Sequence, residues 1–162
     1  MKKILILFLI VSSTSFGQKK LDKLLNKWNK RNVPYISVDS LANTKAVLLD
    51  ARETKEYKIS HLKNAICVGY DYFDVNKTLE KLPEDKNAKI VVYCSLGIRS
   101  EIVADKLIKE GYTNVYNLYG GIFEWKNNNF QVIDTLGNET EKVHTFNKDW
   151  SKWLKKGKKV YE

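Results

Sequence analysis

The residues best suited to chemistry lie between positions 90 and 100. An apolar, mostly β-branched run at residues 90–93 ends at Cys94, and a short loop containing Gly97 and Arg99 follows it. Apolar residues then recur at helical spacing over residues 100–110, which predicts a helix. Cys94 is therefore expected between a buried strand and the first turn of a helix.

This position predicts a reactive thiol at Cys94. Free N–H groups and the helix dipole at a helix start favour the thiolate, which is the nucleophilic form of cysteine. Arg99 can bind an oxyanion through two parallel hydrogen bonds, and Gly97 allows backbone angles at which several N–H groups converge. The alternative is a buried cysteine that acts as a small hydrophobic residue. The glycine, the arginine and the helix start, all within five residues, favour the reactive interpretation.

Length and composition indicate one domain with a substantial core, because the chain has 162 residues and is 43% apolar. The formal charge of +9 raises the question of nucleic-acid binding. The lysines are mostly scattered, however, and the one dense run lies at residues 155–159. We interpret that run as a solvated tail with a mild attraction for small anions, and we expect no nucleic-acid partner.

The first 17 residues have the pattern of a signal peptide. Lys2 and Lys3 precede an apolar run at residues 4–11, far shorter than the roughly 20 residues that span a bilayer. Ser15 and Gly17 place small residues where a signal peptidase cleaves, so we expect a mature chain that begins at Gln18, an exported protein, periplasmic or secreted, and no stable membrane anchor. An uncleaved anchor is the alternative. Without Lys2 and Lys3 the formal charge is +7.

The rest of the chain alternates between strand and helix patterns, which predicts an α/β fold with a mainly parallel sheet. In such sheets catalytic loops follow the carboxyl ends of strands, where Cys94 is expected. Strands are expected at residues 35–38, 46–50, 65–68, 90–93 and 115–118. Helices are expected at residues 21–28, 39–42 (capped by Asp39), 53–58, 71–82, 100–110 and 120–125.

The pattern changes after residue 127. Residues 130–145 are compatible with a hairpin around residues 136–138, and Trp150, Trp153 and Leu154 share one face of a terminal helical turn. We expect an N-terminal helical segment at 18–34, a central domain at 35–127, and an appendage at 128–162 that packs on that domain.

Three stretches of the central domain resemble the single-domain rhodaneses, which are sulfurtransferases. Asp50-Ala51-Arg52, with Glu56-Tyr57 and residues 61–65 after it, resembles the upstream motif of that family. Residues 94–100 resemble its active-site loop, and residues 120–125 resemble its closing motif. The departures are Ser60 in place of a usual glycine and residues 63–64 in place of a usual Pro-Gly.

The resemblance implies a five-stranded parallel sheet in the order 1-5-4-2-3 with helices on both faces. It also implies that Cys94 carries sulfur as a persulfide, taken from thiosulfate or a similar sulfane-sulfur donor and passed to a thiol or cyanide. Asp50 and Arg52 are expected to form a charge network that supports the loop, Trp125 to lie in the core, and no metal or cofactor is expected. We expect a monomer. The expected substrate-binding residues are Ser95, Leu96, Gly97, Ile98, Arg99 and Ser100.

Two other functions compete with this interpretation. Related phosphatases also use a cysteine and an arginine around an oxyanion, but their loop has five intervening residues, whereas four separate Cys94 from Arg99. The other alternative is a non-catalytic module that binds a partner or senses sulfur or redox state; inactive relatives usually lack the cysteine or the arginine, and this chain has both.

The implied strand order also bears on the two cysteines. Cys67 lies in the third strand and Cys94 ends the fourth, so the second strand separates them by about 9–10 Å. A disulfide needs Cα atoms within about 7 Å. We therefore expect no disulfide, and a buried, inert Cys67.

Overall fold

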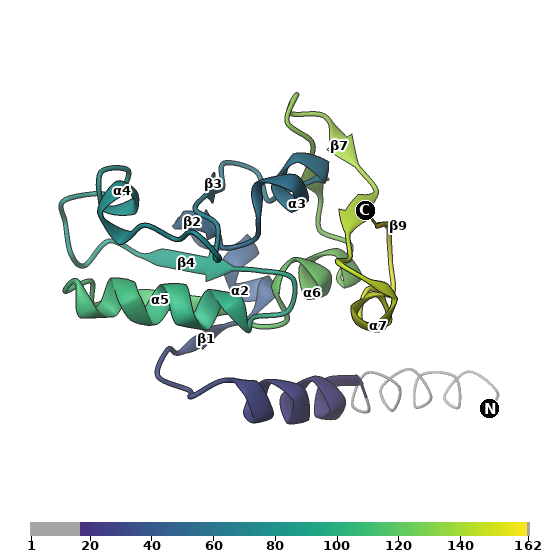
Figure 1. The fold of residues 1–162 in the computed structure, drawn as a ribbon, viewed down its shortest axis with the longest axis horizontal. Coiled ribbons are helices and arrows are strands. Elements are labelled where there is room, and N and C mark those ends of the chain that lie inside the picture. The colour runs from purple at the N-terminus through teal and green to yellow at the C-terminus, as the bar shows by residue number, and fades with distance from the viewer. Residues whose placement is uncertain (1–16, 162) are drawn as a thin grey trace, which may run out of the picture. The chain divides into compact units, whose positions relative to one another are not determined.

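A computed structural model describes residues 17–161 and divides them between two compact units, whose boundary lies between Arg31 and Asn32. The expected signal peptide falls almost entirely outside the described residues. In the first unit a helix spans residues 17–28, which includes the helix expected at 21–28. The second unit carries all the elements described below, and Figure 1 labels most of them.

A five-stranded sheet forms the centre of the second unit. All its strand pairs are parallel, and the order is β1-β5-β4-β2-β3. The α/β fold and the strand order predicted from the sequence are thereby confirmed. The strands are β1 (Tyr35–Ile36), β2 (Val47–Asp50), β3 (Ile66–Cys67), β4 (Ile90–Tyr93) and β5 (Val115–Leu118).

Helices connect these strands, as a parallel sheet requires. They are α2 (Val38–Ala42), α3 (Thr54–Ile59), α4 (Val75–Leu79), α5 (Arg99–Lys109) and α6 (Gly121–Asn127). The longest, α5, packs along β4 and β5 (Figure 1). It turns Val103, Ala104 and Leu107 into the core and leaves Ile102 partly exposed.

The middle strand, β4, is buried on both faces. Its four residues are all 0% exposed. Each fully buried Val or Ile contributes about 1.5–3 kcal/mol relative to an exposed one, so this strand is firmly held. Cys94 follows it directly, so the candidate nucleophile is attached to a fully buried strand.

Residues after α6 add three small pieces to the domain. An antiparallel pair joins β6 (Val132–Ile133) to β7 (Glu139–Thr140), and β8 (Lys142–His144) pairs in parallel with β9 (Lys158–Val160) around α7 (Lys148–Ser151). His61 and Ile133 exchange backbone hydrogen bonds of 2.9 Å in both directions. Lys126 Nζ lies 2.6 Å from Glu141 Oε1. This segment is thus attached to α6 and to the residues after α3.

Two helix predictions were wrong in extent. The helix expected at 71–82 is only α4, because the Glu53 carboxylate binds the N–H groups of Tyr70 and Asp71 and Asp74 caps the helix start. The short helix expected at 39–42 is α2, and it is capped by Ser37 and not by Asp39. The Ser37 Oγ accepts from Ser40 N at 3.1 Å, and β1 ends two residues earlier than expected.

The hairpin expected around residues 136–138 is present, because β6 and β7 pair antiparallel across that turn. It is shorter than the expected 130–145, because residues 142–144 pair instead with the end of the chain. Trp125 was expected in the core but is only partly buried, with Nε1 donating to Gln131 O at 2.9 Å. Lys126 takes the buried position beside it, since Glu141 neutralises its charge.

Both cysteines are free thiols. Asp50 of β2 is in register with Cys67 on one side and with Tyr93 on the other, so one strand separates the two thiols, as expected. Cys67 was expected to be buried but is partly exposed. It lies on β3, an edge strand with a neighbour on one side only.

Candidate active site

Cys94 lies at the carboxyl end of β4, and its thiol is surrounded by hydrogen-bond donors. The N–H of Gly97 points at Cys94 Sγ over 3.1 Å, and the Ser100 hydroxyl lies 3.5 Å from the same sulfur. The Cys94 residue is only 2% exposed. The loop therefore forms a cradle around the sulfur.

These donors change the acidity of the thiol. Burial raises the pKa of Cys94, but the Arg99 guanidinium and hydrogen bonds from Ser100 and Gly97 lower it by more, and the net pKa lies below the ordinary value of a thiol. The thiolate is thus more abundant near neutral pH than in a free cysteine. A thiol that is already ionised needs no separate general base.

Arg99 begins α5 and forms a two-pronged ion pair with Glu56 of α3. Its two terminal nitrogens lie 2.7 and 2.8 Å from the two Glu56 oxygens, and one of them also lies 3.2 Å from Ser95 Oγ. The Glu56 side chain is fully buried, and that of Arg99 is 21% exposed. Burial raises the pKa of Glu56, but the bond to Arg99 lowers it by more, so both groups are charged near pH 7. Glu56 thus fixes the guanidinium beside the sulfur.

Asn117 of β5 holds the loop at residues 94–100 through two side-chain hydrogen bonds. Its amide donates to Gly97 O at 2.8 Å and its oxygen accepts from the Ser100 hydroxyl at 2.7 Å. Gly97 has a φ of +105°, and a Cβ there would lie 3.3 Å from Leu118 O. A side chain at this position would therefore be both strained and crowded.

The start of α6 also forms hydrogen bonds with the loop. The N–H groups of Ile122 and Phe123 donate to the carbonyl oxygens of Cys94 and Ser95 at 2.9 and 3.2 Å. Gly121 has a φ of +56°, and a Cβ on it would lie 2.2 Å from Cys94 O. The glycine pair at 120–121 thus does more than turn the chain, because it lets a helix start approach the reactive loop.

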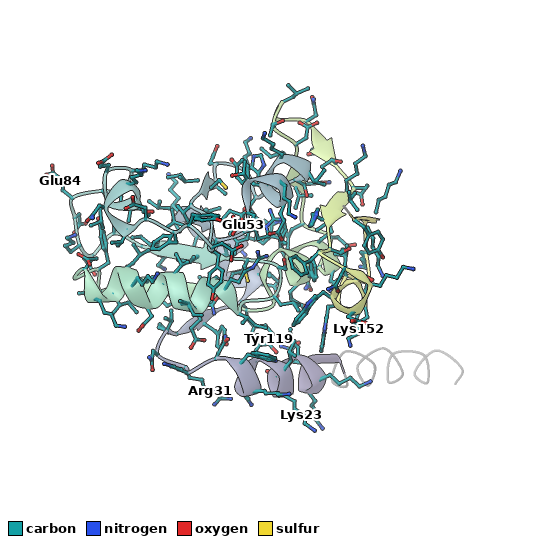
Figure 2. All side chains as sticks on the ribbon, viewed as in Figure 1. Lys23, Arg31, Glu53, Glu84, Tyr119 and Lys152 are labelled. Carbon is teal, nitrogen blue, oxygen red and sulfur yellow. The ribbon has the colours of Figure 1, made fainter. Side chains whose placement is uncertain are left out.

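A pocket of about 310 Å³ opens at Cys94. Side chains from the loop, from the start of α3, from the segment after β3 and from the C-terminal appendage surround it. Glu53, which Figure 2 labels, caps α3 and orders the segment after β3 through the Tyr70 and Asp71 N–H groups, both at 3.0 Å. The lining residues are Glu53, Lys55, Tyr70, Asp71, Cys94, Ser95, Leu96, Ile98, Arg99, Phe146 and Trp150.

Asp50 and Arg52 form a separate buried network next to this site. Both side chains are 0% exposed, and Arg52 Nη2 lies 2.6 Å from Asp50 Oδ2 and 2.7 Å from Ser60 O. Neither side chain is among those that line the pocket. The pair ties the end of β2 to the end of α3, the helix that carries Glu56.

His144 of β8 approaches the Glu56–Arg99 pair from the appendage. Its Nδ1 lies 4.0 Å from Glu56 Oε1 and accepts the N–H of Phe146 at 3.2 Å. An Nδ1 that accepts a hydrogen bond carries no proton. Burial lowers the pKa of His144, so the imidazole is neutral near pH 7.

Comparison with known proteins agrees with this geometry. The model of the rhodanese-like domain family matches residues 37–128, which is more than half of the chain. The chain belongs to the rhodanese-like domain family. Its members are sulfurtransferases and their relatives, and a family of this kind implies a sulfur donor and a sulfur acceptor as substrates.

Two curated relatives and one solved structure illustrate the likeness. A tRNA uridine(34) hydroxylase from Hamiltonella defensa is 42% identical over 49% of this chain and 23% of its own length. An adenylyltransferase and sulfurtransferase from Candida albicans is 34% identical over 69% of this chain and 26% of its own length. A Helicobacter pylori protein solved in solution is 27% identical, with a TM-score of 0.54 over 64% of this chain and 93% of that one. The chain thus spans about a quarter of the length of the curated relatives.

The rhodanese-like domain brings the expected loop residues together around Cys94. Ser95, Leu96, Ile98 and Arg99 line the pocket, whereas Gly97 and Ser100 contact the sulfur. The structure also shows a contact that was not predicted from the sequence. The Arg99 guanidinium forms an ion pair with the Glu56 carboxylate.

Several residues of the site were missed. The sequence analysis named Glu56 only as part of the upstream motif. It did not predict that the Glu56 carboxylate is the buried partner of Arg99. Asn117 lies inside an apolar strand, where a polar residue is itself a signal. Phe146 and Trp150 carry no such signal, since nothing local in the sequence points them to Cys94.

Within residues 17–161, no helix is both long and apolar enough to cross a membrane. In the same residues no group of three or more His, Cys, Asp and Glu side chains is arranged to hold a metal ion.

Proposed function

We propose that this protein is a sulfurtransferase that moves sulfane sulfur from thiosulfate, or a similar donor, to a thiol or cyanide through a persulfide on Cys94. One observation carries the proposal. The Cys94 sulfur has a lowered pKa, accepts the Gly97 N–H at 3.1 Å, and shares a pocket with the guanidinium of Arg99. The site thus combines a nucleophile, a group that can bind an anion, and a pocket through which a substrate can reach the sulfur.

The first half of the reaction forms the persulfide. The Cys94 thiolate attacks the outer sulfur of thiosulfate, the sulfur–sulfur bond of the donor breaks, and its electron pair leaves with sulfite. Arg99 would balance the sulfonate charge. Contacts with Glu56 and Ser95 use three of the five N–H groups of a guanidinium, so its planar fork still has donors for an anion in the pocket.

The second half returns the enzyme to its starting state. The acceptor attacks the outer sulfur of the persulfide, the bond to Cys94 Sγ breaks, and the electron pair restores the thiolate. The Gly97 and Ser100 donors can stabilise both the Cys94 thiolate and the Cys94 persulfide anion, because preorganised donors stabilise negative charge without having to reorganise.

A turnover assay with thiosulfate and cyanide tests this proposal. We expect wild-type turnover, its loss in Cys94→Ser, and near-wild-type turnover in the matched control Cys67→Ala, whose thiol is not among the groups that line the pocket and has a pKa raised by burial. Undiminished turnover in Cys94→Ser would refute the mechanism. A wild-type protein that is folded, reduced and inactive with every donor would favour the alternative, a non-catalytic binding or sensing module.

We also propose that the protein is exported to the periplasm or secreted. The support is the sequence alone: two lysines, a short apolar run and small residues before Gln18. N-terminal mapping of protein recovered from outside the cytoplasm should find Gln18, in open or cyclised form. Recovery of a chain that retains Met1 would contradict the proposal.

A further inference from the structure

Two aromatic side chains of the C-terminal appendage line the pocket at Cys94. Phe146 and Trp150 are both among its lining residues, and both lie beyond the segment at 37–128 that matches the family. The pocket therefore has one part built by the residues that match the family and another supplied by a segment outside that match.

The appendage holds Phe146 in an unusual conformation. Its φ is +64°, which bulky residues seldom adopt, and its side chain remains 49% exposed. Neighbouring contacts maintain this conformation. The Phe146 N–H donates to the buried His144 at 3.2 Å, and Asn147 N donates to Thr145 O at 2.7 Å. An aromatic ring is thus kept beside the pocket, although burial in the core does not hold it there.

Trp150 is fixed by the next turn. Asn147 caps α7 by accepting the Trp150 N–H at 3.1 Å, and α7 ends at Ser151, whose hydroxyl donates to Lys148 O at 2.8 Å. Local hydrogen bonds of the appendage therefore hold the backbone that carries both aromatic side chains beside the pocket.

The charged lining side chains are of both signs, Lys55 and Arg99 against Glu53 and Asp71, and the Glu53 carboxylate is already engaged by two N–H groups. Arg99, beside Cys94, is the group that would bind the sulfonate of the donor. Thiosulfate and cyanide are small polar anions that gain nothing from aromatic rings. An apolar wall instead favours a ligand with an apolar body.

We propose that Phe146 and Trp150 form the acceptor subsite, and that the acceptor is a low-mass thiol with an apolar, aromatic or branched, body. This inference rests on the proposed sulfur transfer. The volume of about 310 Å³ is at the small end of ligand pockets, which fits a small molecule better than a segment of a protein. The acceptor thiolate bonds to the outer persulfide sulfur, the bond to Cys94 breaks, and the products are an acceptor persulfide and the Cys94 thiolate. No oxidant or reductant is needed.

The test compares kcat/KM for two acceptor thiols, phenylmethanethiol and 2-mercaptoethanol, with thiosulfate as donor. The variants are Phe146→Ala, Trp150→Leu and the double variant. Phe146→Tyr keeps the ring, and Tyr72→Ala removes an aromatic side chain that is 94% exposed and lies outside the pocket. In a two-step exchange, kcat/KM for the acceptor reports only the second half-reaction, and kcat/KM for thiosulfate reports the first.

We expect the preference for phenylmethanethiol over 2-mercaptoethanol to fall about tenfold in the double variant, which corresponds to about 1.4 kcal/mol. Phe146→Tyr and Tyr72→Ala should keep the wild-type preference. An unchanged preference in the double variant would overturn the subsite. Faster transfer to reduced thioredoxin than to phenylmethanethiol, lost in the double variant, would overturn the small-molecule assignment. Absence of turnover with every acceptor, cyanide included, in the wild type would instead refute the proposed function, and the subsite with it.

Discussion

The Glu56–Arg99 pair connects the stability of the fold to the chemistry of the loop, and Glu56→Gln probes both. Every group that forms a hydrogen bond with the Glu56 carboxylate is a donor. Its Oε2 accepts from Arg99 at 2.7 Å and from the Glu53 N–H at 3.0 Å, and its Oε1 accepts from Arg99 at 2.8 Å and from Ser95 at 3.4 Å. A glutamine has the same shape but presents N–H groups in place of one oxygen, so donors would face donors on one side.

The size of the effect follows from these contacts. Removing one partner from a fully buried ion pair costs about 3–5 kcal/mol. Arg99 is 21% exposed and Ser95 borders the pocket, so both can turn partly toward water. We therefore expect a loss of about 2–4 kcal/mol in the free energy of unfolding. For a chain of this length, each kcal/mol corresponds to about 2–4 °C in Tm.

Urea unfolding followed by circular dichroism measures this loss. The matched control is Glu84→Gln, an exposed carboxylate that Figure 2 labels far from Glu53, and a surface change of this kind should stay within about 0.5 kcal/mol. Glu56→Gln should also lower the pKa of Cys94 further, because Arg99 loses its countercharge. Equal stability of the two variants, or a higher pKa of the Cys94 thiol in Glu56→Gln, would refute this account of the pair.

Three further predictions concern the same loop. Arg99→Gln should raise the pKa of Cys94, because the guanidinium is among the groups that lower it. The midpoint of iodoacetamide alkylation against pH should then move upward, and kcat/KM for thiosulfate should fall more than tenfold, as the loss of a charge-assisted contact of about 1.5–3 kcal/mol requires; an unmoved midpoint would contradict the electrostatic role. Gly121→Ala should destabilise the protein by more than Gly111→Ala, since both glycines have positive φ but only Gly121 lacks room for a Cβ. Urea unfolding of the two variants checks this, and equal losses would show that strain alone matters. Non-reducing peptide mapping should recover Cys67 and Cys94 unlinked, and a cross-link between them as the main species would refute the strand separation.

The sheet could be predicted because its pattern is local and repeated. The apolar run at 90–93 and the helix at 99–109 are each specified by their own residues, and the resemblance then supplied the strand order. The position of Cys94 at the end of β4 followed from these two elements. The Gly97 backbone was predictable for the same reason, because only a glycine accommodates its φ of +105° at low cost.

The missed features depend on contacts between distant parts of the chain. Glu56 lies 43 residues before Arg99, and no local pattern shows that the two pair. The appendage was harder still. The hairpin around residues 136–138 was predicted correctly, but β8 pairs with β9 instead of extending it, and no local pattern indicates that pairing.

The central claim is that Cys94 carries the transferred sulfur, and intact-mass spectrometry of the reduced protein after incubation with thiosulfate tests it most directly. We predict a gain of one sulfur atom, mapped to the peptide that contains Cys94, reversed by cyanide, and absent in Cys94→Ser but present in Cys67→Ala. Sulfur mapped to Cys67, or a gain that persists in Cys94→Ser, would contradict the account.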